Sequence, residues 1–258
     1  MSNIGSYDDR LKDFSWSIAE RELEYTPGGA INIGWYCSDR ICRMGHGSKT
    51  ALLWEGLGGA EKKFTYDDIR RASNTVGAFL RGLGIREGER VCLFMDKIPE
   101  LYIGVLGILK IGAIAQPLFS AFGDESLFVR LENAQTTAII TQKKHAPKVR
   151  KILDKLPFLA HLIIVDHDGK APLRDREVAF SLEKAEPVEH LDIVPTLAET
   201  PSLLHYTSGT TGQPKGVKHV HYSLIAQYLT AKWVLDIRPD DVYWCTADPG
   251  WVTGTSYG

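Results

Sequence analysis

The chain has few cysteines, no excess of charge of one sign and no basic cluster large enough to dominate its surface. Its 258 residues include 4 cysteines, 30 basic and 32 acidic residues, and the formal net charge at pH 7 is −2. Four cysteines without a C-x-x-C pair exclude a disulfide-stapled scaffold and suit a reducing compartment. The balanced charge lacks the basic excess typical of nucleic-acid-binding proteins, so we expect no nucleic-acid partner.

Long hydrophobic runs are also missing. The most apolar stretch, 101–114, is interrupted by Lys110 and is shorter than the roughly 20 residues that a membrane helix needs. The amino terminus carries Asp8, Asp9 and Arg10 and lacks the apolar centre of a secretion signal. We therefore expect a cytoplasmic protein without membrane association. The hydrophobic content of 44% is nevertheless sufficient for a sizeable core.

Short apolar segments alternate with amphipathic ones along the chain. The pattern predicts strands at 91–95, 113–118, 137–141, 161–166 and 202–206, and helices at 99–112, 124–133, 143–156 and 222–235. A further helix should begin at a capping box formed by Thr65 and Asp68 and end near Gly82 or Gly84. Such alternation predicts an α/β fold with a parallel sheet covered by helices on both faces. Between 168 and 200, prolines and mixed charges predict a loop-rich connector with one short helix near 182–185.

A loop rich in glycine and hydroxyl residues follows the last predicted strand. Gly209, Gly212 and Gly216 let the backbone approach a ligand without an intervening Cβ, so that successive amides can point at an anion. Lys215 adds a mobile positive charge. Hydroxyl groups, which can bind phosphate oxygens or an accompanying metal, come from Thr207, Ser208, Thr210 and Thr211. The composition predicts a polyphosphate-binding loop.

A surface turn and a Walker loop are two other interpretations of this segment, and both fit it less well. Clusters of Gly, Ser and Thr are common in surface turns. The sequence of residue types here, however, is more specific than a turn requires. In a Walker loop the lysine follows a glycine directly and precedes Ser or Thr. Lys215 instead follows Gln213 and Pro214, which excludes the P-loop NTPase interpretation.

The string Thr-Ser-Gly-Thr-Thr-Gly-Gln-Pro-Lys-Gly at 207–216 resembles the signature of the adenylate-forming enzymes. Further segments are similar to the AMP-forming acetyl-CoA synthetases, and these segments are 99–102, 108–113, 117–119 and 242–254. The resemblance runs from about Ile31 to the last residue and is weakest between Lys143 and Thr200.

This resemblance implies the large domain of an adenylate-forming enzyme, truncated before its remaining subdomains. Residues 1–46 would be an amino-terminal cap segment, and 47–258 an incomplete AMP-binding domain. The implied reaction joins a short-chain carboxylate such as acetate to coenzyme A. ATP with Mg²⁺ first yields an acyl adenylate and pyrophosphate, and the coenzyme A thiol then displaces AMP. Such chemistry needs charge neutralisation and positioning rather than a protein nucleophile.

The resemblance also assigns site residues. Thr207 and Lys215 would be catalytic, and the phosphates with Mg²⁺ would be held by Thr207, Ser208, Gly209, Thr210, Thr211, Gly212, Lys215 and Gly216. The near wall of the acyl pocket would be formed by Trp251, Val252, Thr253 and Gly254. Core packing is the rival interpretation of that aromatic and branched group. The preceding Asp-Pro-Gly at 248–250 favours an exposed turn at a strand end, where open α/β sheets bind ligands.

Two polar groups have less specific signals. His205, His219 and His221 could suggest a metal site, but no cysteine or carboxylate lies nearby in the sequence, so we interpret them as structural or pocket-edge histidines and assign no protein-bound metal. The basic residues of the 143–156 segment could meet the phosphates of coenzyme A; a solvated helix face explains them equally well and is the preferred interpretation. These residues are Lys143, Lys144, Lys148, Arg150 and Lys151.

In the family, the adenine pocket, the ribose-binding aspartate, the hinge and the small carboxy-terminal domain lie downstream of position 258. We therefore expect the chain to be about the first half of such an enzyme and to be inactive alone. A separate polypeptide carrying the missing half is one potential partner. Two alternatives remain: a non-catalytic remnant or half of a split enzyme, and a medium-chain or aryl ligase. The match around 251–257 argues against the latter.

Overall fold

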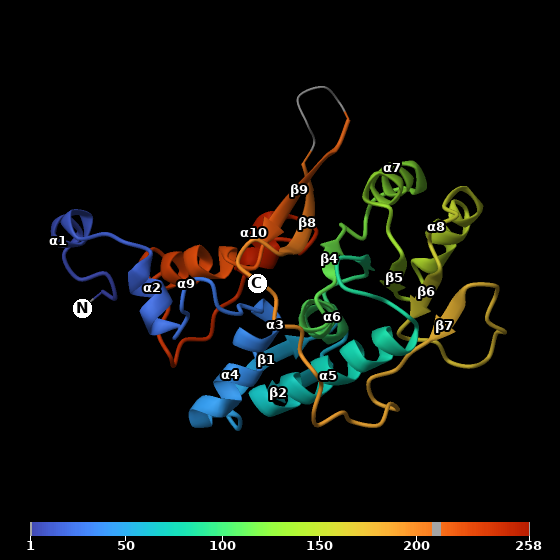
Figure 1. Cartoon of the computed structure of the whole chain (residues 1–258). Helices are drawn as coiled ribbons and strands as arrows, with labels where there is room; N and C mark the ends of the chain where they lie inside the picture. The colour runs from blue at the N-terminus through green and yellow to red at the C-terminus, as the bar shows by residue number, and fades with distance from the viewer. Residues whose placement is uncertain (1, 208–212, 258) are drawn as a thin grey trace.

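The computed structural model describes residues 2–207 and 213–257 of the chain (Figure 1). The helices are α1 Tyr7–Lys12, α2 Ser17–Glu22, α3 Ile33–Tyr36, α4 Asp39–Ile41, α5 Tyr66–Gly82, α6 Pro99–Lys110, α7 Asp124–Ala134, α8 Ala146–Arg150, α9 Ser223–Trp233 and α10 Val252–Ser256, with a π-helical turn at Cys42–His46 and a 3₁₀ turn at Leu153–Lys155. The strands are β1 Thr50–Glu55, β2 Glu61–Thr65, β3 Arg90–Phe94, β4 Ile114–Pro117, β5 Ala138–Thr141, β6 His161–Ile164, β7 Glu177–Ala179, β8 Pro201–Thr207 and β9 Lys215–Val220.

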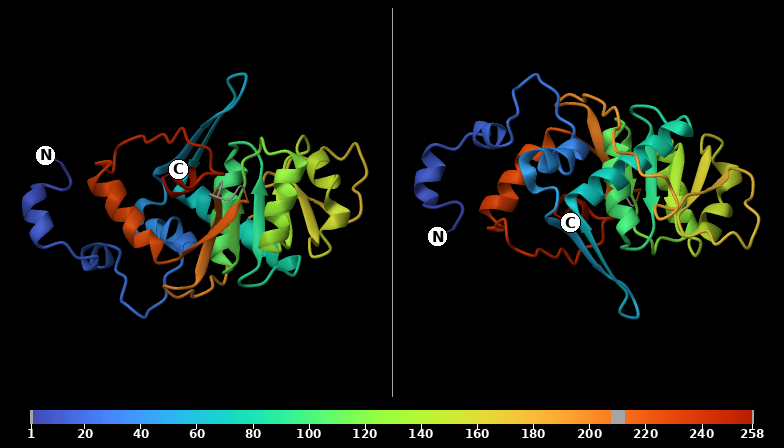
Figure 2. Two further views of the ribbon diagram at one scale, coloured as in Figure 1. Left: turned by 90° about the horizontal axis from the view of Figure 1, so that it is seen from above. Right: turned by 90° about the horizontal axis from the view of Figure 1, so that it is seen from below.

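The main sheet has seven strands in the order β7-β6-β5-β3-β4-β8-β9. The first six strands in this order, from β7 to β8, are parallel to one another. The last strand, β9, pairs antiparallel with β8 at one edge. Figure 2 shows helices on both faces of this sheet and the separate β1–β2 hairpin projecting from the body. The α/β fold with a mostly parallel sheet is therefore confirmed.

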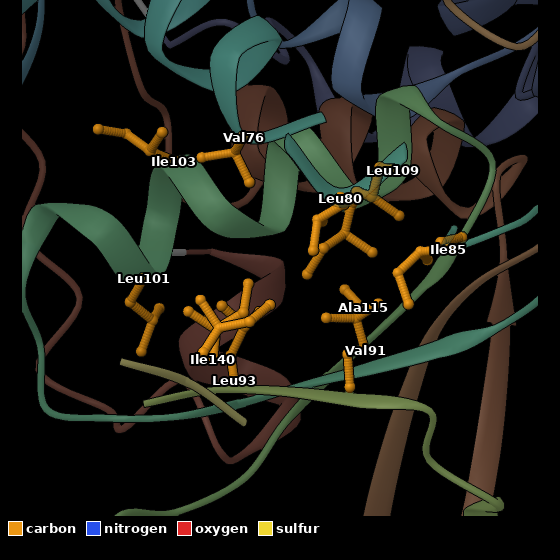
Figure 3. Packing of buried hydrophobic residues seen from close by; sticks show 14 of the residues in the cluster. Val76, Leu80, Ile85, Val91, Leu93, Leu101, Ile103, Leu109, Ala115 and Ile140 are labelled. Atoms are coloured by element: carbon orange, nitrogen blue, oxygen red, sulfur yellow. The ribbon is translucent and has the colours of Figure 1, made fainter. Parts of the chain in front are cut away.

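Alternation along the central strand β3 builds two cores. Val91 and Leu93 face one side of the sheet and pack beneath α5 and α6, as Figure 3 shows for these residues and for Leu80 of α5. Cys92 and Phe94 face the other side, where they join the apolar residues of α7 and α8. Successive side chains of a strand point to opposite faces, so a continuous apolar strand between two helical layers is buried on both sides. A third apolar cluster joins α2 to α9.

A fully buried lysine ties the amino-terminal segment to this core. Lys110 ends α6, and its ammonium lies 2.6 Å from the carboxylate of Asp39 and donates to Asn74 Oδ1 at 2.7 Å and to the Arg70 carbonyl at 3.3 Å. Asn32 donates to the Leu109 carbonyl at 2.8 Å. Burial lowers the pKa of Lys110 below its usual value, while Asp39 opposes that change. Three helices thus share one buried ammonium.

Several local predictions are corrected by the structure. The expected helix at 143–156 is broken, because its helical part is limited to α8 and a 3₁₀ turn at Leu153–Lys155. Residues 182–185 form a turn rather than a helix, and the connector contains a short strand, β7. No regular strand precedes the turn at 248–250, since 242–247 has none in the described chain. The capping box of Thr65 and Asp68 is confirmed. Among the described residues, no helix is both long and apolar enough to cross a bilayer.

The buried ion pair gives a stability prediction. Asp39→Ala leaves a buried ammonium without its counter-charge, and we expect a loss of about 3 kcal/mol in the free energy of unfolding. In the double variant Asp39→Ala/Lys110→Met, no charge is left unpaired, so most of that loss should be recovered. Urea unfolding of the two variants checks this expectation. A double variant no more stable than Asp39→Ala would contradict the role given to the ion pair.

Candidate functional site

The glycine-rich segment is carried by an antiparallel hairpin at the edge of the sheet. Strands β8 and β9 pair from Pro201 and Val220 to Thr207 and Lys215, with a register shift between Pro201 and Leu203. Thr207 and Lys215 are directly paired at the open end. Both of these side chains are exposed. Ser208, Gly209, Thr210, Thr211 and Gly212 lie outside the described residues.

Tyr206, one residue before the open end of the hairpin, fixes β8 to α7. Its hydroxyl donates to Asn133 Oδ1 at 2.8 Å and lies 3.1 Å from the Arg130 carbonyl, and burial raises the pKa of Tyr206 to about 12. Gly216 pairs with Tyr206 across the ladder, and a Cβ on Gly216 would lie 3.4 Å from the Tyr206 ring and 3.2 Å from Leu204. Gly216 therefore allows close packing of β9 on β8, a role beyond ligand contact.

The second predicted element, the wall at 251–254, lies beyond the end of β4. The Gly250 amide donates to Asp248 Oδ1 at 2.8 Å and closes the turn. A Cβ on Gly250 would lie 2.3 Å from the Phe119 amide nitrogen, so only glycine allows the turn to rest on the residues after β4. The Trp251 ring then lies over Phe119 with 6.5 Å between ring centroids.

The four predicted pocket residues divide into two groups. Trp251, Val252 and Thr253 are exposed at the start of α10, whereas Gly254 is buried. A Cβ on Gly254 would lie 2.2 Å from the Asp248 carbonyl oxygen. Gly254 is thus a packing residue of the turn, and the other three side chains are those available to a ligand.

Two residues at this site were missed by the sequence interpretation. Phe119 faces Trp251, and Lys97 donates to the Thr246 carbonyl at 2.9 Å. The Lys97 carbonyl in turn accepts a hydrogen bond from Trp54 of the β1–β2 hairpin at 2.8 Å. Phe119 follows a buried parallel strand, a position from which side chains reach the ligand-binding edge, and that signal was available. Nothing in the sequence pairs Lys97 with Thr246.

The hairpin end and the pocket wall share one edge of the sheet. β4 and β8 are neighbouring parallel strands, in register at Ala115 and Leu203, so their carboxyl ends point the same way. Figure 1 shows α10 beside the β8–β9 hairpin. Within the described chain, the ring contact of Trp251 is to Phe119 rather than to Thr207 or Lys215. The two parts are therefore adjacent components of one edge.

Two of the three predicted histidines, His205 and His221, are buried, whereas His219 is half-buried. The rings of His205 on β8 and His219 on β9 meet edge to face with centroids 5.5 Å apart, and neither ring nitrogen of His205 has a hydrogen-bond partner in the described chain. His221 Nδ1 accepts a hydrogen bond from the Ile33 amide at 3.1 Å. Burial lowers the pKa of His205 and of His221 to about 4. His221 is thus partly satisfied by the backbone, whereas the buried His205 ring is held by packing alone among the described residues.

The basic residues at 143–151 are each paired with another group of the chain. Lys143 lies 2.7 Å from Asp168, Arg150 lies 2.7 Å from Glu177, and Lys151 lies 3.4 Å from Asp124. Lys144 pairs with Asp96, and Lys148 donates to the Ser120 carbonyl at 2.8 Å. The segment is thus a network of ion pairs and hydrogen bonds, much of it exposed.

The structure defines an open α/β protein with a mostly parallel sheet, and the hairpin end and the turn at 248–250 lie at the carboxyl edge, where such sheets usually bind ligands. The family of AMP-binding enzymes matches residues 41–258. The chain belongs to this family.

Relatives and a solved structure agree with that assignment. The chain is 39% identical over 99% of its length to the acetyl-coenzyme A synthetase of Bacillus subtilis, of which it covers 44%. It is 34% identical over 89% of its length to the acetyl-coenzyme A synthetase of Pyrobaculum arsenaticum, of which it covers 38%. A crystal structure of an acyl-CoA synthetase from Brucella canis is similar with a TM-score of 0.87 and 28% identity, over 97% of this chain and 44% of that one. The chain therefore spans well under half the length of the relatives it matches.

Buried neutral histidines predict a pH-dependent stability. The pKa of His205 is about 4 in the fold and 6.5 without burial, so the unfolded chain binds protons first as the pH falls. The contribution of His205 to stability should be constant above about pH 6.5 and be lost between about pH 6.5 and 4, with a size on the order of 3 kcal/mol. His205→Leu should reduce this slope, whereas the exposed His190→Gln should leave it unchanged. Urea unfolding at several pH values provides the measurement, and equal slopes in the two variants would contradict it.

The close approach of Gly250 to Phe119 predicts a strict glycine requirement. Gly250→Ala places a methyl group against the backbone, and we expect a loss of about 1–3 kcal/mol in unfolding free energy together with a changed tryptophan emission. Gly82→Ala is the matched control, because a Cβ at Gly82 meets nothing within 4 Å and alanine favours a helix. If the two variants unfold at the same urea concentration, the proposed packing of the turn is wrong.

Proposed function

We propose that the chain supplies the phosphate-binding hairpin and acyl-pocket wall of an AMP-forming acyl-CoA ligase acting on acetate or another short-chain carboxylate. One observation carries the proposal: Thr207 and Lys215 are paired at the open end of a hairpin, on the strand next to the one that ends at the Phe119–Trp251 contact. Polyphosphate and a small acyl group would then be held side by side at one sheet edge.

In this proposal the hairpin binds the β and γ phosphates of ATP. Lys215 and Thr207 are exposed. The neighbouring Tyr206 is fixed by its hydrogen bond to Asn133 of α7, so the ammonium and the hydroxyl face solvent from a well-defined strand end. The residues 208–212 would add backbone amides and hydroxyls. Charge-assisted hydrogen bonds to phosphate are among the stronger ones in proteins, and stabilising a transferring phosphoryl group by fixed charges is the main requirement of this chemistry.

Mg²⁺ fits this arrangement as a companion of the nucleotide. Among the described residues there is no group of three His, Cys, Asp or Glu side chains suited to a metal. The ion would therefore be held chiefly by phosphate oxygens, with a hydroxyl of the loop at 207–211 as its protein ligand, in keeping with the preference of Mg²⁺ for oxygen and water. When bound, it would neutralise phosphate charge.

The acyl group would lie against Trp251, Val252 and Thr253. The Trp251 ring is held over Phe119, and the turn before it is fixed by Gly250 and by the hydrogen bond from Lys97 to Thr246. The short alkyl chain of an acetate-sized carboxylate would contact these side chains, a substrate class in keeping with the names of the curated relatives.

Coenzyme A would be the second substrate. The other residues that the reaction needs would come from additional polypeptide, either in the same protein or in a partner chain. Residues 1–46 would act as the cap of the domain at 47–258. Four free cysteines in the described chain suit a reaction in the cytoplasm.

Loss of the loop lysine should weaken phosphate binding without unfolding the chain. Lys215 is exposed, so Lys215→Ala removes a charge-assisted contact worth about 1.5 kcal/mol, or about tenfold in affinity. Calorimetric titration with pyrophosphate and with Mg–ATP measures the effect. Lys218→Ala is the control, because Lys218 is an exposed lysine of the same strand, three residues further from the loop.

The same variants then test catalysis. In a fusion of this chain to the downstream part of the Bacillus subtilis acetyl-coenzyme A synthetase, Lys215→Ala should lower acetate-dependent exchange of pyrophosphate into ATP more than Lys218→Ala. Equal pyrophosphate affinity in both variants, or an effect of Lys218→Ala as large as that of Lys215→Ala, would exclude the assigned role of Lys215.

A further inference from the structure

Helix α1 buries none of its own residues. It spans Tyr7–Lys12 and contains no buried residue. Figures 1 and 2 show it at the amino-terminal extremity, set apart from the sheet and its helical layers. Its apolar side chains are turned outward, since Tyr7 is 65% and Leu11 is 64% exposed. A short helix of this kind gains most of its stability from packing, which this chain alone does not supply.

The support of α1 is nevertheless well defined. The Asn3 amide donates to Asp236 Oδ1 at 2.6 Å, and the Asn3 side chain donates to the Lys232 carbonyl at 3.1 Å and to the Ile237 carbonyl at 2.9 Å. Beyond the helix, Phe14 meets Trp233 of α9 with centroids 6.4 Å apart. Both ends of α1 are thus attached to the end of α9, and the exposed face is held in place.

Two side-chain rows run along α1. Tyr7 and Leu11 are four residues apart and lie on one face, and Asp8 and Lys12 form the neighbouring row with the same spacing. The first turn is acidic and the last turn is basic. Among the described residues, the ion pair of Lys12 is to Asp9 of its own helix at 3.6 Å, with both side chains 74% exposed. Such an exposed ion pair contributes little stability, so Lys12 can leave Asp9 and pair with a carboxylate of another molecule at little cost.

We propose that this face, the α1 face formed by Tyr7, Asp8, Leu11 and Lys12, binds the same face of a second copy of the chain across a two-fold axis. In an antiparallel arrangement, the acidic first turn of one helix lies opposite the basic last turn of the other. Asp8 of each copy then meets Lys12 of its partner, and the apolar rows lie between the two contacts. A two-fold interface requires this kind of self-complementary surface.

The charges of α1 favour a second copy over a membrane surface. Residues 8–13 contain Asp8, Asp9 and Asp13 against Arg10 and Lys12, and anionic lipid attracts basic segments rather than acidic ones. Arg10 is already engaged within the chain, where its guanidinium lies over the Trp233 ring. The inference is independent of the proposed catalytic function.

The first experiment compares two exposed leucines by sedimentation equilibrium over a range of micromolar concentrations. The unchanged chain should be in monomer–dimer equilibrium, and Leu11→Ser should raise the dissociation constant by at least about tenfold. Leu57→Ser, at the fully exposed tip of the β1–β2 hairpin, is the matched control and should leave the constant unchanged. Circular dichroism verifies that all variants are folded. A monomeric unchanged chain, or equal effects of the two substitutions, would overturn the proposal.

The second experiment exchanges charges. Asp8→Lys and Lys12→Asp each place like charges opposite one another at both symmetric contacts, so each variant alone should dimerise at least about tenfold more weakly. An equimolar mixture restores opposite charges at both contacts and should form the heterodimer with near-original affinity. Association through any other exposed apolar surface would give no such recovery. A mixture that associates no better than its components would exclude the antiparallel α1 pairing.

Discussion

The common direction of the parallel strands determines the rest of this structure. Because β3, β4, β5 and β8 run the same way, the segments that follow them emerge at one edge. Phe119 beyond β4 and Thr207 at the end of β8 are brought to neighbouring positions by that geometry alone. The turn at 248–250 then rests on the residue after β4, where only glycine fits. The strands thus serve as a support for the segments at this edge, the part of such folds that usually carries function.

The buried Lys110 makes the amino-terminal segment part of that support. A charged group is costly to bury unless it is paired and hydrogen-bonded, and the partners of this ammonium come from Asp39, Asn74 and the Arg70 carbonyl. One side chain thus fixes α4 and α5 against the end of α6. Asn32 adds a bond to the same helix end at Leu109. The arrangement specifies the position of the segment more than it adds to overall stability.

Sequence patterns predicted the elements whose signals are local. The capping box at Thr65 and the apolar strand from Val91 to Phe94 depend on a few adjacent residues, and both were identified. The helix expected at 143–156 was overextended, because Pro147 lies in the first turn of α8 and starts the helix there. Strand β7 is three residues long and exists through its pairing with β6, which no local pattern reveals. Phe119 and Trp251 are distant in sequence, so their contact was equally hidden.

The edge position of the β8–β9 hairpin has a mechanical consequence. Six register pairs join β8 to β9, whereas β8 meets β4 at Ala115 and Leu203. The two strands are therefore held mainly by each other, by the pairing at Leu203 and by the Tyr206 hydroxyl, which donates to Asn133 of α7. Displacement of the open end need not disturb β3 or β5, which keep their own neighbours. Changes in the length of the segment between β8 and β9 can accordingly be accommodated at this edge strand without altering the central strands of the sheet.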